Sequence, residues 1–394
     1  MTGPTEVFDA VVVGGGPAGS TAAETFARAG KSVLLLDKAG RIKPCGGAIP
    51  PRLIRDFAIP EHLICAQIRA ARMVAPSHRT VDMPIDGGYV GMVDREVFDA
   101  FLRERAASAG AVRRTGVYER IGREQPGLAE VHFRTPAGPA SVKARVVIGA
   151  DGALSQVARQ EVAPEGPRYV FAYHEVVRVP GGGGAGFDAK RCDVVYDGAI
   201  SPDFYGWVFP HGATASIGSG SAQKGFSLKR SVADLRKASG LEGWETVRRE
   251  GAPIPMKPLR RWDNGRDVVL AGDAAGVVAP ASGEGIYYAM VGGQLAAEAG
   301  VAFLADGDAR ALGLARRRFM KAHGRVFWIL GMMQHFWYRN DRRRERFVSI
   351  CRDKDVQALT WQAYMNKELV RSKPAAHLRI FVKDVAHLLG LGTP

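Results

Sequence analysis

Apolar and polar positions along the chain predict strands and helices in a repeated order. Two apolar runs, at 11–13 and 146–148, and a predicted strand at 266–271 each lead into a glycine-rich turn. Such runs are typical of buried strands. Stretches with the composition and alternation of further strands lie at 131–134, 141–147, 170–179, 192–196, 205–209 and 215–219. The chain is therefore expected to combine strand–turn–helix units with a region rich in strands.

The first turn has the spacing Gly14-x-Gly16-x-x-Gly19 and opens a helix near Pro17 and Ala18. Gly14 permits the tight turn, Gly16 lets the backbone approach a pyrophosphate, and Gly19 lets the helix pack close to the strand. The helix N-terminus then offers N–H groups to phosphate oxygens. We predict a dinucleotide here; the alternative is a glycine-rich turn of some other α/β protein.

A second apolar strand, at 32–36, ends at Asp37 and Lys38. A carboxylate at this point accepts hydrogen bonds from a ribose and disfavours a 2′-phosphate. We therefore expect FAD or NAD, rather than NADP, in the first turn.

Later turns add further candidates for cofactor binding. Arg95 begins a helix over 95–109, where it either reaches a ligand phosphate or stays on the surface. Asp151 and Gly152 follow the strand at 146–148, and the Asp151 carboxylate could accept a hydrogen bond from a cofactor. The third turn comprises Gly272 and Asp273, and the helix after it offers another free N-terminus. The residues around that N-terminus are Gly283, Gly285 and Ile286.

Two stretches stand out for substrate chemistry. The loop 43–51 is rich in proline and glycine, which excludes regular structure, and contains Cys45, Gly46, Gly47 and Ala48. The strand Tyr205-Gly206-Trp207-Val208-Phe209 places its three aromatic rings on one face because side chains alternate along a strand. This row is either ordinary core or the wall of an apolar ligand cavity.

The expected fold class is α/β. Residues 1–75, 93–160 and 261–309 are predicted to form a discontinuous, Rossmann-like nucleotide-binding domain. Residues 76–92 and 161–260 are predicted to form a second, α+β domain on a mainly antiparallel sheet. Residues 310–394 form a basic helical region. A length of 394 residues is ample for two such domains.

Composition narrows the class of protein. With 46% hydrophobic and 24% charged residues the chain is an ordinary globular protein. We find no leader before Phe8 and no apolar segment near the ~20 residues of a membrane span, the longest candidate being 326–333. A cytoplasmic protein is therefore expected. The four cysteines lack metal-ligand spacing, so we predict reduced thiols and no metal site.

The net charge of +14 is concentrated near the C-terminus. From Arg310 onward there are eighteen Lys and Arg against six Asp and Glu. Nucleic acid, anionic lipid and water are all compatible with such clusters, and we expect no nucleic acid partner. The stretch 319–338 carries an apolar set between basic residues, and it lies either on a membrane surface or against the second domain. That set is Phe327, Leu330, Met333, Phe336 and Trp337.

The three glycine-rich turns occur in the order and spacing of the para-hydroxybenzoate hydroxylase-like flavoproteins, which residues 8–305 resemble. The resemblance implies that the nucleotide-binding domain holds FAD and the second domain holds substrate. It assigns FAD contacts to Gly14, Gly16, Gly19, Asp37, Arg95, Asp151 and Asp273. We extend the expected FAD site to Pro17, Ala18, Lys38, Cys45, Gly46, Gly47, Ala48, Gly152, Gly272, Gly283, Gly285 and Ile286.

Two motifs narrow this resemblance. Tyr205-x-Trp207-x-Phe209-Pro210 with Gly218-x-Gly220 is similar to the substrate motif of geranylgeranyl reductases, and Lys43–Ala48 is similar to their cysteine loop. The run 44–51 resembles the chlorophyll and bacteriochlorophyll branch. Tyr205, Trp207, Phe209 and Pro210 are therefore the expected substrate-binding residues.

The resemblance implies reduction of three double bonds of a geranylgeranyl chain to phytyl. The carrier of that chain is either a (bacterio)chlorophyll pigment or the free diphosphate. Cys45 is our candidate for a residue near the reacting alkene that donates or relays a proton, because a thiol is mostly protonated at neutral pH. A small side chain chosen for fit is the alternative. NADPH is the expected electron donor, with a ferredoxin-type donor as the alternative.

Two other functions stay open at this point. One is an aromatic monooxygenase, although hydroxylases usually carry His where this chain has Gly276. The other is a non-catalytic flavin- or pigment-binding carrier that works through the basic C-terminal region. Peripheral association with the cytoplasmic face of a photosynthetic membrane is compatible with that charge. The sequence predicts no particular oligomeric state.

Overall fold

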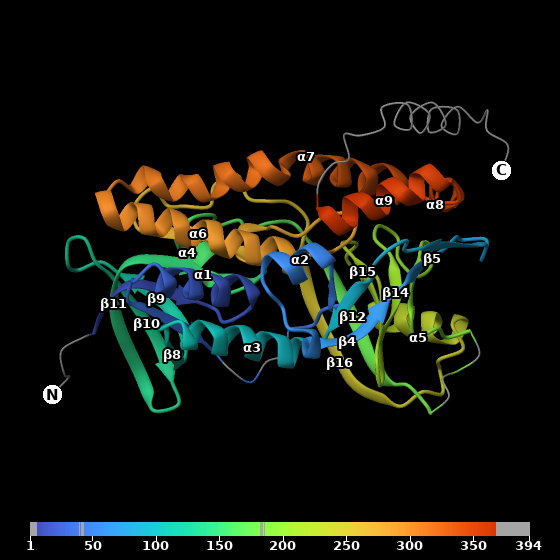
Figure 1. Cartoon of the computed structure of the whole chain (residues 1–394), viewed down its shortest axis with the longest axis horizontal. Coiled ribbons are helices and arrows are strands. Elements are labelled where there is room, and N and C mark those ends of the chain that lie inside the picture. Colours follow the sequence, from blue (N-terminus) through green and yellow to red (C-terminus); the bar gives the residue numbers. More distant parts are fainter. Residues whose placement is uncertain (1–5, 39, 41–42, 182–183, 185, 368–394) are drawn as a thin grey trace. The chain divides into compact units, whose positions relative to one another are not determined.

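A computed structural model describes residues 6–38, 40, 43–181, 184 and 186–367 of the chain (Figure 1). Its contacts divide the chain into two compact units. Unit 1 comprises the chain up to Lys43, Arg95–Tyr169 and Pro253–Trp328. Unit 2 comprises Pro44–Asp94, Val170–Ala252 and the described chain from Ile329 onward. The last 27 residues of the predicted C-terminal region, 368–394, lie outside the described part.

Unit 1 is built on a sheet with the strand order β8-β2-β1-β11-β10-β9, in which β17 also pairs with β11. The strands β8, β2, β1, β11 and β17 are parallel, and β10 and β9 extend the sheet as antiparallel neighbours. The parallel part explains the unbroken apolar runs, because both faces of such strands are buried. The strands are β1 (Val7–Val13), β2 (Val33–Asp37), β8 (Val112–Thr115), β9 (Val117–Gly122), β10 (Ala129–Thr135), β11 (Gly138–Gly149) and β17 (Val268–Leu270).

Helices cover this sheet, and the pair α1 and α6 lie against each other (Figure 1). Small residues permit the close contact: a methyl group at Gly293 of α6 would lie 2.1 Å from the Ala18 carbonyl oxygen of α1. The helices are α1 (Pro17–Arg28), α3 (Arg95–Ser108), α4 (Gln156–Glu161), η2 (Gly272–Ala275), α6 (Ile286–Asp306) and η3 (Ala309–Gly313). The predicted Rossmann-like arrangement is confirmed.

Among the described residues, α6 is the one helix long and apolar enough to cross a membrane by length and composition. This corrects the sequence prediction, which named 326–333 as the longest apolar candidate. More than half of α6 is buried inside the protein, where its alanines and glycines pack against α1. The apolar composition of α6 is therefore explained by packing within unit 1.

Unit 2 holds two sheets. The larger of these two is mainly antiparallel and has the order β16-β12-β15-β14-β13-β5-β6, in which β13 and β5 are parallel. A small sheet with the order β3-β7-β4 accompanies it. The strands are β3 (Ala48–Ile49), β4 (Ile64–Ile68), β5 (Ala70–Val74), β6 (Thr80–Pro84), β7 (Val90–Val93), β12 (Tyr169–Arg178), β13 (Arg191–Val195), β14 (Gly206–His211), β15 (Thr214–Ser221) and β16 (Thr246–Pro255). The helices are α2 (Pro51–Asp56), η1 (Glu61–Leu63), α5 (Leu228–Ala238), α8 (Asp341–Ile350) and α9 (Lys354–Asn366).

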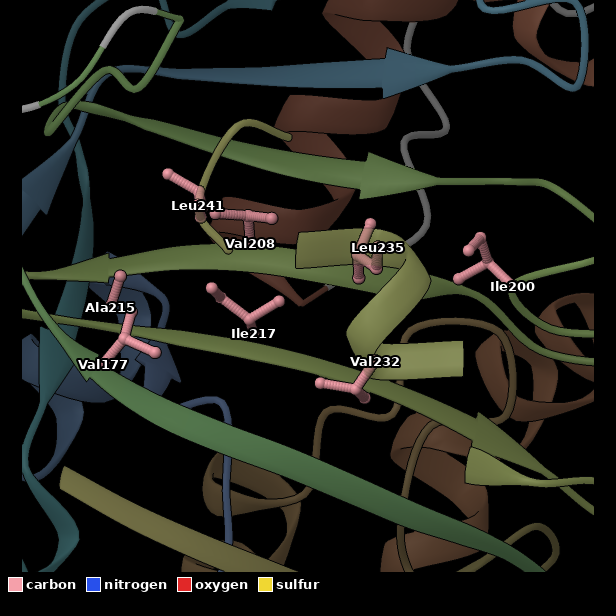
Figure 2. Close-up of a cluster of buried hydrophobic side chains, with 8 residues drawn as sticks. All are labelled: Val177, Ile200, Val208, Ala215, Ile217, Val232, Leu235 and Leu241. Carbon is pink, nitrogen blue, oxygen red and sulfur yellow. The ribbon is translucent and has the colours of Figure 1, made fainter. Parts of the chain in front are cut away.

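One face of the larger sheet is closed by α5. Alternate residues of β12, β14 and β15 point to this helix and form a buried apolar cluster with it (Figure 2). The cluster comprises Val177, Ile200, Val208, Ala215, Ile217, Val232, Leu235 and Leu241. By the period of two, the intervening residues of these strands occupy the other face, which carries the aromatic row.

The boundaries of the two units differ from the predicted domain boundaries. Residues 44–75 were predicted to lie in the nucleotide-binding domain, but their contacts belong to unit 2. The reason is local pairing, because β3 and β4 both pair with β7. The pairing of β3 also corrects the prediction that loop 43–51 contains no regular structure. Residues 310–394 were predicted as a separate region, but the described part divides between the units near Trp328.

The helix predicted at 319–338 begins earlier, as α7 (Leu314–Trp337). Phe327 and Trp337 of the predicted apolar set are buried, and Phe327 contacts Tyr288 with 4.9 Å between ring centroids. This set therefore packs inward and does not form an exposed face. A different stripe is exposed at helical spacing: Lys321, Arg325, Trp328, Met332 and His335.

Several basic residues of the C-terminal region are engaged within the fold. Arg316 donates to the Leu259 carbonyl oxygen at 3.0 Å, and Arg318 pairs with Glu298 at 3.0 Å. Arg344 is buried and pairs with Asp341 at 2.6 Å. Part of the local charge excess thus stabilises the protein's own structure.

Candidate functional site

The first glycine-rich turn has the geometry expected of a pyrophosphate site. Gly14 has a φ of +106°, and a methyl group there would lie 2.3 Å from the Ala150 carbonyl oxygen. Gly19 packs against the carbonyl of Gly14, whereas a methyl group at Gly16 would meet nothing within 4 Å. Gly16 is the N-cap of α1, and among the described residues no side chain caps this helix. An open space therefore adjoins an uncapped helix N-terminus, which fits a phosphate group.

Asp37 lies at the end of β2 and helps to shape the same turn. Its Oδ1 accepts a hydrogen bond of 3.1 Å from the Gly15 amide. Arg103 of α3 donates to the Gly15 carbonyl oxygen at 3.2 Å and lies 3.7 Å from Asp37 Oδ2. Lys38, which follows Asp37, is exposed. Sequence reasoning missed Arg103, because its position on a helix gave no sign of a contact with the turn.

The third turn meets the first within unit 1. A methyl group at Gly272 would lie 2.7 Å from Ala18 Cβ. Asp273 is buried and pairs with Lys43 at 2.5 Å. Gly285 is the N-cap of α6, directly before Ile286, and a methyl group there would lie 3.7 Å from Asp273 Oδ1. Two helix N-termini and an ion pair therefore lie around one region, preceded by the loop that contains Gly283.

Lys43 is a second residue that sequence reasoning missed as part of this site. It was assigned to the cysteine loop, and its partner Asp273 lies 230 positions later in the chain. Neither residue carries a local pattern that would reveal the pair.

The second glycine-rich turn also lies beside the first, but its Asp151 carboxylate already accepts hydrogen bonds within the protein. A methyl group at Gly14 would lie 2.9 Å from Asp151 Cα, which places the backbone at the turn. The Asp151 carboxylate accepts hydrogen bonds from Ser155 Oγ (2.5 Å) and from the amides of Gln156 (2.7 Å) and Val157 (3.2 Å). Burial raises the pKa of Asp151, and these hydrogen bonds oppose the shift. The carboxylate thus caps α4, and Gly152 follows it in the turn.

Arg95 is likewise engaged at the start of α3. Its guanidinium donates two hydrogen bonds to the Asp99 carboxylate, at 2.8 and 2.7 Å, and both side chains are buried. Arg95 therefore does not lie on the surface, which was one of the two alternatives, and its contact with a cofactor stays a prediction.

The cysteine loop lies on one end of β14, within unit 2. A methyl group at Gly46 would lie 3.1 Å from the Phe209 ring, and one at Gly47 would lie 2.6 Å from His211 Nε2. The Gly47 amide donates to Cys45 Sγ at 3.4 Å, and Ala48 pairs with Met92. The half-buried Cys45 is therefore held in a loop that packs on the aromatic strand.

His211 is a third residue that sequence reasoning missed. Its Nδ1 lies 3.0 Å from the Phe209 carbonyl oxygen. Burial lowers the pKa of His211, although hydrogen bonds to the backbone of Phe209 and Gly46 and the charge of Asp94 oppose this effect. The neutral ring thus joins β14 to the cysteine loop.

The aromatic row has the predicted arrangement on one face. The ring centroids of Tyr205 and Trp207 are 6.0 Å apart, and those of Trp207 and Phe209 are 6.2 Å apart. Tyr205 and Trp207 are buried, and Phe209 is half-buried. Pro210 pairs with Ala215 and alternates to the opposite face, which carries the α5 cluster. Pro210 was predicted with the substrate residues, but it does not share their face.

All four cysteines are unpaired in the structure. Within the described residues, no group of three or more His, Cys, Asp or Glu side chains could hold a metal ion.

The chain is similar to known proteins over most of its length. A family model described as an NAD(P)-binding Rossmann-like domain matches residues 12–53. Geranylgeranyl diphosphate reductase of Rhodobacter capsulatus is 60% identical, over 98% of this chain and 99% of that protein. The protein of the same name from Synechocystis is 36% identical, over 97% and 98%. Digeranylgeranylglycerophospholipid reductase of Methanoculleus marisnigri is 32% identical, over 76% and 78%.

Solved structures show the same fold. A geranylgeranyl bacteriochlorophyll reductase-like protein from Thermoplasma acidophilum superposes with a TM-score of 0.80 at 22% identity, over 95% of this chain and all of that one. The p-nitrophenol 4-monooxygenase of Pseudomonas putida superposes with a TM-score of 0.68 at 17% identity, over 93% of this chain and all of that one.

Proposed function

This chain belongs to the geranylgeranyl reductase family, and on that premise we propose that it reduces three double bonds of a geranylgeranyl chain to give phytyl. The observation that carries the proposal is that the loop containing Cys45 packs against Phe209 and His211 at the end of the aromatic strand β14. Cys45, the proposed proton donor, and the aromatic row, the proposed apolar wall, are 160 or more positions apart in the chain. Both belong to unit 2, where the neighbours of Cys45, Gly46 and Gly47, lie against β14.

The proposed cofactor is FAD, and the residues of unit 1 fit it. The uncapped N-terminus of α1 and the space beside Gly16 suit the pyrophosphate. Asp37 adjoins the same turn, where a carboxylate can hold a ribose. The N-terminus of α6 and the Lys43–Asp273 pair would hold further polar groups. When bound and reduced, FAD supplies the hydride chemistry.

The chain's own residues meet the other demands of the reaction. An isolated alkene accepts hydride only if the neighbouring carbon is protonated nearly at the same time, so a nearby acid is needed. We assign that role to the Cys45 thiol. A prenyl tail presents almost only apolar surface, and Tyr205, Trp207 and Phe209 offer a matching wall that excludes water.

We propose NADPH as the electron donor and a geranylgeranyl ester of a (bacterio)chlorophyll, or geranylgeranyl diphosphate, as the substrate. The relatives named above support reduction of a prenyl chain rather than hydroxylation of an aromatic ring or a carrier role. A pigment ester and a free diphosphate share the same prenyl tail, so the aromatic wall suits both.

Anaerobic turnover with mass analysis tests the proposal. The purified, FAD-loaded protein is incubated with NADPH and, separately, with geranylgeranyl bacteriochlorophyll and geranylgeranyl diphosphate. We expect mass gains in steps of two hydrogens, up to six. Unchanged substrates with a reducible flavin would contradict the function, as would a product that gains oxygen in air.

A matched pair of variants tests Cys45. We expect Cys45→Ala to slow alkene reduction in a single turnover by at least about tenfold while the flavin is still reduced normally. Cys65→Ala removes another thiol of unit 2 and should leave the rate unchanged. Equal rates for both variants and the wild type would remove the proton-donor role.

We also propose that the protein works in the cytoplasm, bound peripherally to the photosynthetic membrane. The support is the exposed stripe of α7, where Trp328 is 64% and Met332 46% exposed. Arg325 and Lys321 precede Trp328 by about one and two helical turns and are exposed as well. A basic helix face with a large aromatic residue suits an anionic lipid surface.

A further inference from the structure

A line of buried polar groups extends from the ring of Trp207 into the sheet of unit 2. The indole Nε1–H of Trp207 donates to Ser216 Oγ at 3.1 Å. Ser216 Oγ lies 2.8 Å from His174 Nδ1, and His174 Nε2 lies 3.0 Å from Glu250 Oε2. Ser216 is 2% and His174 4% exposed. Burying this many polar groups costs free energy unless each is hydrogen-bonded, so these groups depend on one another for their hydrogen bonds.

The strand register places these groups on the face of the aromatic row. Trp207 of β14, Gly218 of β15 and His174 of β12 are direct neighbours across three strands. Ser216 precedes Gly218 by two residues and therefore shares its face. A methyl group at Gly218 would lie 2.2 Å from Trp207 Cζ2 and 2.6 Å from His174 Cβ. The absence of a side chain at Gly218 thus gives the indole its place between the strands.

One arrangement of hydrogens satisfies the whole line. Trp207 donates to Ser216, the Ser216 hydroxyl donates to Nδ1 of a neutral His174, and Nε2–H of that ring donates to the Glu250 carboxylate. Arg248 lies 3.1 Å from the other oxygen of Glu250. Burial raises the pKa of Glu250, but its hydrogen bond from His174 and its ion pair with Arg248 outweigh this effect, so the carboxylate stays ionised.

Serine, histidine and glutamate in this order resemble a nucleophilic triad. The geometry opposes that role, because Ser216 Oγ is buried and already accepts the indole hydrogen of Trp207. The line ends on the aromatic ring, and its chemistry therefore concerns the position of that ring.

We infer that Ser216 and His174 are positioning residues that fix the plane of the Trp207 indole. They thereby fix the position in which the prenyl chain binds during successive reductions. The effect on the prenyl chain rests on the proposed function. Three double bonds must reach the same reacting group in turn. The aromatic row therefore has to bind the prenyl chain at three different depths of insertion. If the Trp207 indole turns freely, it binds the prenyl chain less well at some of these depths than at others.

Ser216→Ala and Ser219→Ala form a matched pair for the test. Both serines are buried on β15, but Ser219 donates to the Ile200 carbonyl oxygen at 2.7 Å. Because side chains alternate along a strand, Ser219 lies on the opposite face of the sheet from Ser216. The first readout needs no substrate: hydrogen exchange of the Trp207 indole N–H in protein labelled with 15N-tryptophan, assigned through Trp207→Phe. We expect exchange to be at least about tenfold faster in Ser216→Ala and unchanged in Ser219→Ala.

The second readout is the product pattern. We expect Ser216→Ala to accumulate partly reduced products, with gains of two and four hydrogens, and to form the fully reduced product about tenfold more slowly. Glu250→Gln still accepts from His174 and should lie between Ser216→Ala and the wild type in both readouts.

Equal indole exchange in Ser216→Ala and the wild type would overturn the inference. So would faster exchange with an unchanged ratio of partly to fully reduced product. If the wild type itself reduces no prenyl substrate, the proposed function fails, whereas the exchange readout still decides whether the polar line fixes the ring.

Discussion

Gly218 illustrates how much the substrate face depends on a single missing side chain. We expect Gly218→Ala to displace the Trp207 ring or to push β15 away from β12, because the added methyl group would lie 2.2 Å from the indole. Overpacking of this kind costs about 1–3 kcal/mol. The midpoint of urea unfolding and the rate of prenyl reduction should both fall. Gly243→Ala, where a methyl group meets no described residue within 4 Å, is the control and should leave both unchanged.

His211 makes the stability of unit 2 depend on pH. Its pKa is lowered in the folded state, so below the ordinary value near 6.5 the unfolded chain binds a proton that the folded chain does not. The free energy of unfolding should therefore fall as the pH drops below about 6.5, with a slope of at most about 1.4 kcal/mol per pH unit.

Urea unfolding at pH 7.5, 6 and 5 checks this expectation. His211→Asn removes the titrating group, so the variant should show a flatter dependence over this range than the wild type. Acids with lowered pKa values, such as Asp82 and Glu345, act at lower pH and should affect both proteins alike. Parallel curves for the two proteins would contradict the assignment to His211.

At the scale of elements, the start of α4 decides what Asp151 does. Its carboxylate caps the helix together with Ser155, whose Oγ accepts from the Ala158 amide at 2.8 Å. We expect Asp151→Ala and Ser155→Ala each to lower the free energy of unfolding by about 1 kcal/mol, as the loss of a cap does. If capping is the whole role, flavin affinity, measured by fluorescence titration, should stay the same in both variants. A loss of affinity confined to Asp151→Ala would instead give the carboxylate a direct part in holding the cofactor.

The elements themselves were largely predictable because their signals are local. Apolar runs before glycine-rich turns identified β1, β11 and β17, and the period of two placed Tyr205, Trp207 and Phe209 on one face. The contacts between elements were not predictable in the same way. The pairing of Lys43 with Asp273 and of His174 with Ser216 depends on strand register and chain path, which no short stretch of sequence encodes.

The α7 stripe shows the same limit. A helical apolar pattern was correctly recognised near 319–338, but the pattern alone does not say which face is covered. Phe327 and Trp337 turned out to be buried, and Trp328 and Met332 exposed. Partly buried helices carry apolar residues on more than one side, so composition by itself misplaces the outer face.

At the scale of the whole molecule, this exposed stripe should govern attachment to lipid. We expect the double variant Trp328→Ser/Met332→Ser to bind vesicles of phosphatidylcholine and phosphatidylglycerol about tenfold more weakly in sedimentation, because exposed apolar groups anchor a helix in the interface. Phe171→Ser, which removes another exposed aromatic ring (53% exposed), is the control. Binding that is equal in both variants, or absent in the wild type, would contradict peripheral attachment through α7.

The way the chain crosses between its two units has a consequence for synthesis on the ribosome. Unit 1 begins with β1, α1 and β2, but it also needs β17 and α6, which are translated only after Pro253. Domains usually fold in order as they emerge from the ribosome. Here the first dinucleotide turn has to wait, with the α1 surface that α6 will cover still exposed, until most of the polypeptide has been made. Nascent chains that stop early should therefore be unable to retain flavin and should be targets for chaperones and proteases.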